Sequence, residues 1–194
     1  MRSDFYNFLY GKESVNHKLF LAINHAANPV FDVIMPIFTC LGDSWRIYPY
    51  LAIIFILFLV KRELMPLKYL IVYGIAVFID FSLVEALKGW LHVPRPAAAI
   101  GIDQVRVLVE LKLKDTIPSG HATFSFMTAT VLSFNRSNIW KFCLYLFALL
   151  VAYSRIYVGA HYPLDVVVSG ILGASIGYAT WEGYRGITGL IRQK

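Results

Sequence analysis

Charged residues and cysteines are both scarce in this sequence. Only 15% of the 194 residues are charged, whereas 58% are hydrophobic, and the mean hydropathy is +0.60. This composition excludes an ordinary soluble domain, because exposed helices in water need charged surface. The two cysteines, Cys40 and Cys143, lie inside apolar runs without the spacing of a metal site or a disulfide framework. We therefore expect an integral membrane protein whose cysteines are reduced and serve packing.

Three further kinds of segment are missing. The polar N-terminus has no apolar stretch followed by a small-residue cleavage site, so we expect no signal peptide. Low-complexity tracts and long repeats are absent. The formal net charge of +6 comes from basic residues scattered between apolar runs rather than gathered with aromatic residues on one face. The sequence thus predicts no nucleic-acid partner and one domain over residues 1–194.

Long apolar runs are abundant. A helix needs about 20 residues to cross the hydrocarbon core of a membrane. Six runs qualify as candidate spans: residues 20–41, 45–60, 65–91, 119–134, 139–157 and 163–181. Polar residues interrupt the first run. The alternative for its N-terminal half is an amphipathic helix that lies in the membrane interface. The predicted fold class is all-α, a polytopic membrane bundle of about six transmembrane helices.

The distribution of basic residues predicts the orientation of this bundle. Six spans place both termini on one side of the membrane, which carries eleven of the 18 Lys and Arg residues, against seven on the other side. By the positive-inside rule the first side is cytoplasmic. The loop of residues 92–118, with its three prolines and several charges, therefore faces outward. We expect the chemistry at that side.

Three polar clusters fall at the outward ends of separate spans. In chain order they contain Lys88, Arg95 and Pro96, then Pro118, Ser119, Gly120 and His121, and then Ser154, Arg155, His161 and Asp165. Lys88, Arg95 and Arg155 supply three cations, which a metal-free site needs to stabilise the charge of a transferring phosphoryl group. These cations would repel one another without an anion, so phosphate is their natural counter-ion.

The second and third clusters contain groups that could bind and attack phosphate. Ser119 and Gly120 begin a span, where free backbone N–H groups favour an anion; the alternative is that Ser119 is only an N-cap. Asp165 follows His161 by four residues and can accept Nδ1–H, which leaves Nε2 free to attack phosphorus. The alternative is an interfacial histidine and an acid that stabilises the helix dipole.

The patterns KxxxxxxRP, PSGH and SRxxxxxHxxxD, in this order over residues 88–165, resemble the type 2 phosphatidic acid phosphatase (PAP2) family. That family shares its phosphate site with vanadium haloperoxidases. The resemblance implies a PAP2/haloperoxidase-like catalytic core, with His161 as the nucleophile, His121 as the general acid and Asp165 as the residue that orients His161. The implied phosphate-binding residues are Lys88, Arg95, Ser119, Gly120 and Arg155.

The resemblance further implies a phosphohistidine intermediate without a metal or another cofactor. The sequence looks most like the bacterial envelope lipid phosphatases, located in the cytoplasmic membrane with the site facing the periplasm or exterior. Expected partners are membrane lipids and a lipid phosphate substrate, with lipid A 1-phosphate, undecaprenyl diphosphate, phosphatidylglycerophosphate and phosphatidic acid as candidates. The alternatives are a non-catalytic lipid-phosphate-binding or transport protein and a soluble haloperoxidase. The complete catalytic set disfavours the first, and the apolar spans disfavour the second.

Three acidic residues in or near the spans need a role. Ionisable groups at membrane depth are costly and often functional. Glu85 precedes Lys88 by three residues on one helix, so we expect it to support that lysine. Asp80 should face the bundle interior towards a polar partner, and Asp43 is expected to be a structural cap.

Small residues recur every four positions in the last candidate span, at Ser169, Gly173 and Gly177. Such a stripe allows another helix to approach closely. We expect it to serve helix packing.

Overall fold

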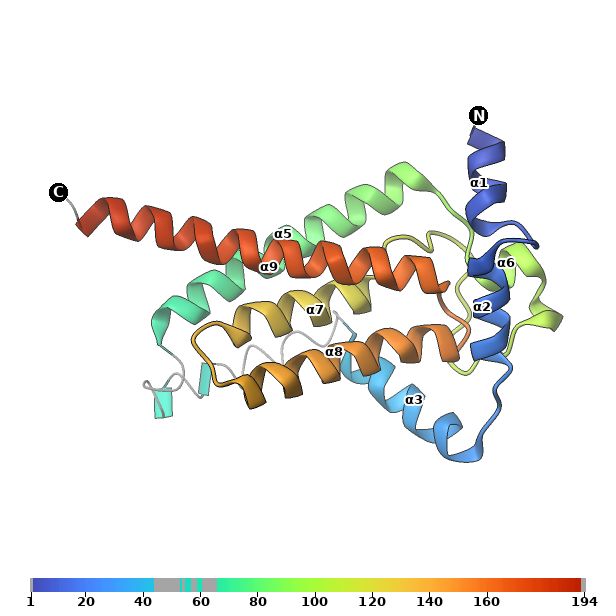
Figure 1. Ribbon diagram of the computed structural model, residues 1–194, viewed down its shortest axis with the longest axis horizontal. Helices are drawn as coiled ribbons and strands as arrows, with labels where there is room; N and C mark the ends of the chain where they lie inside the picture. The colour runs from blue at the N-terminus through green and yellow to red at the C-terminus, as the bar shows by residue number, and fades with distance from the viewer. Residues whose placement is uncertain (1, 44–52, 54, 57–58, 61–65, 193–194) are drawn as a thin grey trace.

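The computed structural model describes residues 2–43, 53, 55–56, 59–60 and 66–192, and these residues form helices and connections with no strand. This confirms the predicted all-α fold class. The elements are α1 Arg2–Tyr10, α2 Val15–Asn24, α3 Pro29–Leu41, α5 Leu67–Leu91, α6 Pro96–Ile100, the 3-10 helix η2 Ile102–Gln104, α7 Gly120–Ser133, α8 Asn138–Tyr157 and α9 Pro163–Arg192. Helices α5, α7, α8 and α9 run side by side, and α1, α2 and α6 lie at one end of this bundle (Figure 1).

Helix α7 is the centre of the bundle. It packs most extensively against α9 and α8 and also contacts α5. Buried side chains occur all round it, which explains why its sequence shows no single apolar stripe. The predicted span 119–134 therefore forms a helix, but with 14 residues it is about 21 Å long, less than the hydrocarbon core of roughly 30 Å.

Three helical stretches in the described part of the chain are long and apolar enough to cross a membrane: Leu67–Ile100, Asn138–Tyr157 and Pro163–Leu190. They correspond to the predicted spans 65–91, 139–157 and 163–181. The last helix continues past its predicted end at residue 181, and the left-handed conformation of His92 ends α5. The predicted span 45–60 lies almost entirely outside the described residues.

The prediction of one continuous span over residues 20–41 is wrong. The helical stretches Tyr6–Asn24 and Pro29–Leu41 meet at an angle of 116°. Asn28 causes the break, because its side chain caps α3 by accepting from the backbone N–H groups of Val30 and Phe31, at 2.9 and 3.2 Å. Pro29 reinforces the break, since the residue before a proline is disfavoured in the helical conformation.

The small residues of α9 face α7, as predicted. A side chain at Gly173 would collide with the backbone carbonyl of Thr123, and one at Gly177 would lie 3.0 Å from the carbonyl oxygen of Met127. The Ser169 hydroxyl accepts a hydrogen bond of 2.6 Å from the N–H of Ser119. The stripe thus brings two helix backbones into direct contact.

A polar network anchors the loop 92–118 to the N-terminal helices. Asn24 donates to the carbonyl of Arg106 at 2.8 Å and accepts from its N–H at 2.9 Å. The Arg106 guanidinium bonds Asp32 at 2.7 Å, and the Tyr157 hydroxyl donates to the same carboxylate at 2.6 Å. The loop is therefore tied to α2, α3 and α8 at one point, beside the predicted site.

Candidate active site

The predicted site residues gather at one end of the bundle, where α5 and α8 end and α7 and α9 begin. A cavity of about 360 Å³ lies there. Its lining residues are Asp43, Asp80, Phe81, Val84, Glu85, Lys88, Arg95, Lys112, Lys114, Asp115, Gly120, His121, Arg155 and His161. All three predicted cations and both predicted histidines therefore border one cavity, although they come from five different segments.

His161 lies in the short connection between α8 and α9 and is only 1% exposed. Its Nε2 atom is 3.3 Å from Arg95 Nη1. A guanidinium can only donate, so Nε2 must be the acceptor and the ring proton must be on Nδ1. This tautomer leaves the lone pair of Nε2 next to the guanidinium of Arg95.

The other ring nitrogen contacts Thr116, a residue outside the three sequence patterns. His161 Nδ1 lies 3.3 Å from Thr116 Oγ1, and the same hydroxyl donates to Asp165 Oδ2 at 2.5 Å. The direct distance from Nδ1 to Asp165 Oδ2 is 3.7 Å, too long for a hydrogen bond. The expected direct contact is therefore corrected: Thr116 bridges the histidine and the carboxylate.

The surroundings of His161 keep its ring neutral. Burial lowers its pKa well below the usual value, and the positive charges of Arg95 and Arg155 add to this effect. A protonated imidazole would have no lone pair at Nε2. Burial and the two arginines at the cavity thus favour the neutral form of the ring, which keeps this lone pair.

The three cations are fixed by different partners. The Arg95 guanidinium donates from Nε to the Lys114 carbonyl at 2.8 Å and from Nη1 to the Ala160 carbonyl at 3.2 Å. Arg155 Nη1 donates to the Thr39 hydroxyl, and both arginines are buried. Neutral oxygens hold these two groups, so their charge remains available to an anion.

Lys88 has a different partner. Its Nζ lies 3.3 Å from Glu85 Oε1, which is the supporting contact expected from their spacing. Its Nζ also lies 3.9 Å from the position that a side chain at Gly120 would occupy. The lysine therefore lies close to the first turn of α7.

His121 lies on the first turn of α7 and borders the same cavity as His161. Its Nε2 is 4.0 Å from Asp43 Oδ1. The expectation that Asp43 is only a structural cap needs revision, since its carboxylate faces the second histidine. The sequence signal for this contact is an acidic residue at the outward end of a predicted span.

Ser119 behaves differently from the expectation. Its N–H is directed to Ser169, its side chain makes no capping bond, and the residue is fully buried outside the cavity lining. Ser119 occupies the N-cap position of α7, as in the alternative, but without a side-chain capping bond, and its N–H is engaged by Ser169. Gly120, the next residue, does line the cavity.

Asp80 is buried within α5, with 3% exposure, and borders the inner part of the cavity. The interior location agrees with the sequence. The expected polar partner is not found among the described residues, where Oδ1 has no hydrogen bond. Those residues also contain no group of three or more His, Cys, Asp or Glu side chains placed to hold a metal ion.

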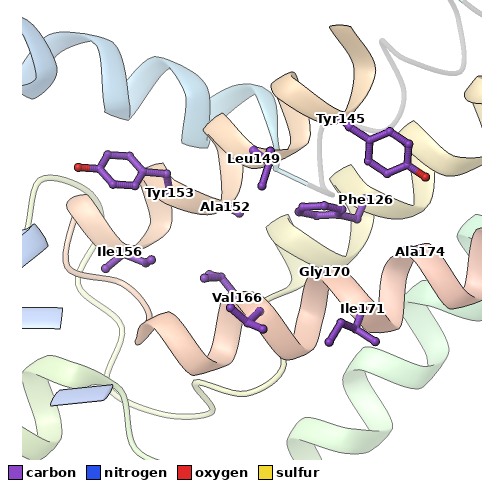
Figure 2. Close-up of a pocket in the computed structure, with 11 residues that line it drawn as sticks. Phe126, Tyr145, Leu149, Ala152, Tyr153, Ile156, Val166, Gly170, Ile171 and Ala174 are labelled. Carbon is purple, nitrogen blue, oxygen red and sulfur yellow. The ribbon is translucent and has the colours of Figure 1, made fainter. Parts of the chain in front are cut away.

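A second hollow shares α7 and α8 with the cavity but has another character. Figure 2 shows an apolar groove between α8 and α9, with Phe126 of α7 at its base, and its volume is about 490 Å³. Ile156 and Val166 point into it, although each is the chain neighbour of a site residue. No lining residue is charged. The groove shares no lining residue with the polar cavity.

Together, the helical membrane bundle and the cavity with its two histidines and three cations define a membrane protein that handles phosphate groups. The profile of the PAP2 superfamily matches residues 66–188, which include every predicted site residue. The chain belongs to the PAP2 superfamily.

Several relatives agree with this assignment. The undecaprenyl-diphosphatase BcrC of Bacillus subtilis is 30% identical over 167 residues, 84% of this chain and 81% of that protein. The bacitracin transport permease protein BcrC of Bacillus licheniformis is 29% identical over 108 residues, so the match spans only about half, 51%, of that relative. The predicted class, a PAP2 phosphatase, agrees with the first of these names.

Two crystal structures share the fold. Aquifex aeolicus LpxE is 34% identical, with a TM-score of 0.76 over 87% of this chain and 96% of that one. A PAP2-type phosphatidylglycerolphosphate phosphatase of Bacillus subtilis has a TM-score of 0.73 over 94% of this chain and 90% of that one. At 22% identity, the second likeness supports the fold alone. The predicted PAP2-like membrane architecture is confirmed.

Proposed function

We propose that this protein is a lipid phosphatase of the bacterial cytoplasmic membrane that removes phosphate from an envelope lipid through a phosphohistidine. The observation that carries the proposal is the pairing of Arg95 Nη1 with His161 Nε2 at 3.3 Å. This pairing puts an unprotonated nitrogen and a phosphate-binding cation at one wall of the cavity.

The first step is attack of His161 Nε2 on phosphorus, which forms the N–P bond as the bond between phosphorus and the leaving oxygen breaks. His121 gives its proton to that oxygen when the leaving group is an alcohol. Lys88, Arg95 and Arg155 stabilise the negative charge on the phosphoryl oxygens. In the second step the unprotonated His121 accepts a proton from water as the water oxygen attacks phosphorus and the N–P bond breaks, which releases inorganic phosphate and free His161.

We infer that the substrate is a phosphorylated envelope lipid. Support comes from the relatives, since one is named for undecaprenyl diphosphate and the LpxE structure matches nearly its full length. Undecaprenyl diphosphate, lipid A 1-phosphate, phosphatidylglycerophosphate and phosphatidic acid are the candidate substrates. All combine a phosphate that suits the polar cavity with a lipid portion that suits the membrane.

The test is release of inorganic phosphate by the detergent-purified protein from each of these four lipids. Turnover of at least one lipid, with no need for added divalent metal and no inhibition by a chelator, is expected. A second candidate function, lipid-phosphate binding or transport without turnover, is favoured by the name of the Bacillus licheniformis relative. Binding of a lipid phosphate without phosphate release would establish that second function and refute the first.

The site is further proposed to face the periplasm or exterior, which rests on the eleven-to-seven distribution of Lys and Arg. In a variant without the two native cysteines, Asp103→Cys in η2 should react with an impermeant thiol reagent on intact cells. Ser137→Cys, exposed between α7 and α8 at the other end of the bundle, should react only after lysis. The reverse pattern would place the site in the cytoplasm.

A further inference from the structure

Tyr10, at the end of the N-terminal helix α1, reaches the catalytic centre from the far end of the sequence. Its hydroxyl donates a hydrogen bond of 2.8 Å to Asp165 Oδ1, and both side chains are buried. Position 10 lies outside the segment 66–188 that matches the PAP2 superfamily. None of the three sequence patterns includes it.

We propose that Tyr10 is a positioning residue that acts through Asp165, an inference that rests on the proposed function. The two oxygens of this carboxylate have separate partners. Oδ1 accepts from Tyr10, whereas Oδ2 accepts from Thr116 at 2.5 Å and from the backbone N–H of Tyr162 at 2.9 Å. With both oxygens engaged, the carboxylate cannot turn without leaving a buried charged atom unsatisfied.

The orientation of Asp165 matters because Oδ2 faces the hydroxyl that bridges to His161. Among the described residues, Tyr10 is the single hydrogen-bond donor to Oδ1. Loss of that donor would favour rotation of the carboxylate towards other donors. The Thr116 hydroxyl would then lose its fixed acceptor. It would no longer be held in place to accept the hydrogen bond from the Nδ1–H group of His161.

Tyr10 is itself held firmly. Its ring stacks on Tyr6, with ring centroids 5.4 Å apart, and meets Tyr162 edge to face at 5.2 Å. A few residues further on, Asn16 Oδ1 accepts a hydrogen bond of 2.9 Å from the N–H of Leu164. The N-terminal segment therefore contacts the beginning of α9 at two successive residues, which keeps the phenol next to Asp165.

The decisive variant is Tyr10→Phe, which keeps the ring packing and removes only the hydroxyl. We expect kcat to fall about 10–100-fold, the usual effect of removing a group that orients a catalytic residue, while KM stays unchanged. Formation of the phosphohistidine in single-turnover experiments should slow by the same factor. Tyr6→Phe is the matched control, because it removes a hydroxyl from the neighbouring turn of α1 and should match the wild type.

A double-variant comparison separates positioning from general stability. If Tyr10 acts through Asp165, adding Tyr10→Phe to Asp165→Asn should cause little further loss of kcat. Losses of kcat that multiply in the double variant would overturn the proposal. A fully active Tyr10→Phe enzyme, or one in which KM alone changes, would also overturn it. So would a loss of activity that equals the unfolded fraction measured in thermal melts. An inactive wild type would instead refute the proposed function, and this inference with it.

Discussion

The polar cavity and the apolar groove both take residues from α7 and α8, yet eleven of the fourteen residues that line the cavity are ionisable and none that lines the groove is charged. Successive residues on a helix point about 100° apart. Arg155 therefore faces the cavity while Ile156 faces the groove. Helix α8 therefore contributes one face to the polar cavity and an adjacent face to the apolar groove.

This difference indicates where substitutions should matter. In the cavity, charges are held at fixed distances by buried partners, so the loss of one atom changes the chemistry. In the groove, side chains contribute mainly apolar volume, and lipid chains of the bilayer can occupy the space that a smaller side chain leaves. The following predictions test that division, from the largest expected effect to the smallest.

The largest effect is expected for His161→Ala. Removal of the nucleophile deletes the covalent step, so kcat should fall by about 10⁴-fold or more with every substrate. Phosphate release by the purified variant measures this. Retention of wild-type turnover would show that phosphorus is attacked by some other group.

His121→Ala should have a large effect that depends on the leaving group. For a lipid monophosphate the departing alcohol needs a proton, and kcat should fall by about 10²–10⁴-fold. A lipid diphosphate releases a phosphate that is stable as an anion, so its loss should be smaller. Parallel assays of both substrates at one pH and one detergent concentration measure the ratio. Equal losses would identify His121 as a phosphate donor rather than an acid.

Substitutions of Thr116 should have an intermediate effect on kcat, and the conservative one should restore activity. Thr116→Val removes the hydroxyl between His161 and Asp165 and should lower kcat by about 10–100-fold. Thr116→Ser keeps the hydroxyl and should recover most of the activity. The two variants have to be compared at equal folded fraction, measured by thermal melting. If valine and serine behave alike, the bridge has no catalytic role.

The smallest effect is expected in the groove. Ile171 is 66% exposed on the outer surface of α9 and lines the groove without touching the cavity. Ile171→Ala should leave kcat and KM unchanged and shift stability by only about 0.5 kcal/mol or less. A strong increase in KM would link the groove to substrate binding. It would contradict the view that only the polar cavity matters for activity.

Sequence reasoning located most of this site because its residues carry a spaced pattern of charge and histidine at the ends of spans. Lys88, Arg95, His121 and His161 could be selected in this way. Their geometry required the fold, because the bridging role of a threonine hydroxyl and the 3.7 Å separation of His161 from Asp165 depend on how α9 and the loop 92–118 meet.

The fold was predictable to a similar degree and for similar reasons. Helices α5, α8 and α9 are long apolar runs, and their positions follow from composition. The break before Pro29 was missed because the apolar run continues across it, and Asn28 reads as a minor polar interruption unless its capping geometry is known. Tyr10 could not be connected to Asp165 from the sequence, since 155 positions separate them.

The glycine stripe of α9 has a consequence for the spacing of the two histidines. Helix α7 carries His121, and α9 begins two residues after His161. Because Gly173 allows the α9 backbone to touch that of α7 at Thr123, this contact sets how closely the two helices approach each other. A larger residue at position 173 would push the helices apart only two residues from His121. The spacing between the segments that carry the two histidines thus depends on the absence of a side chain.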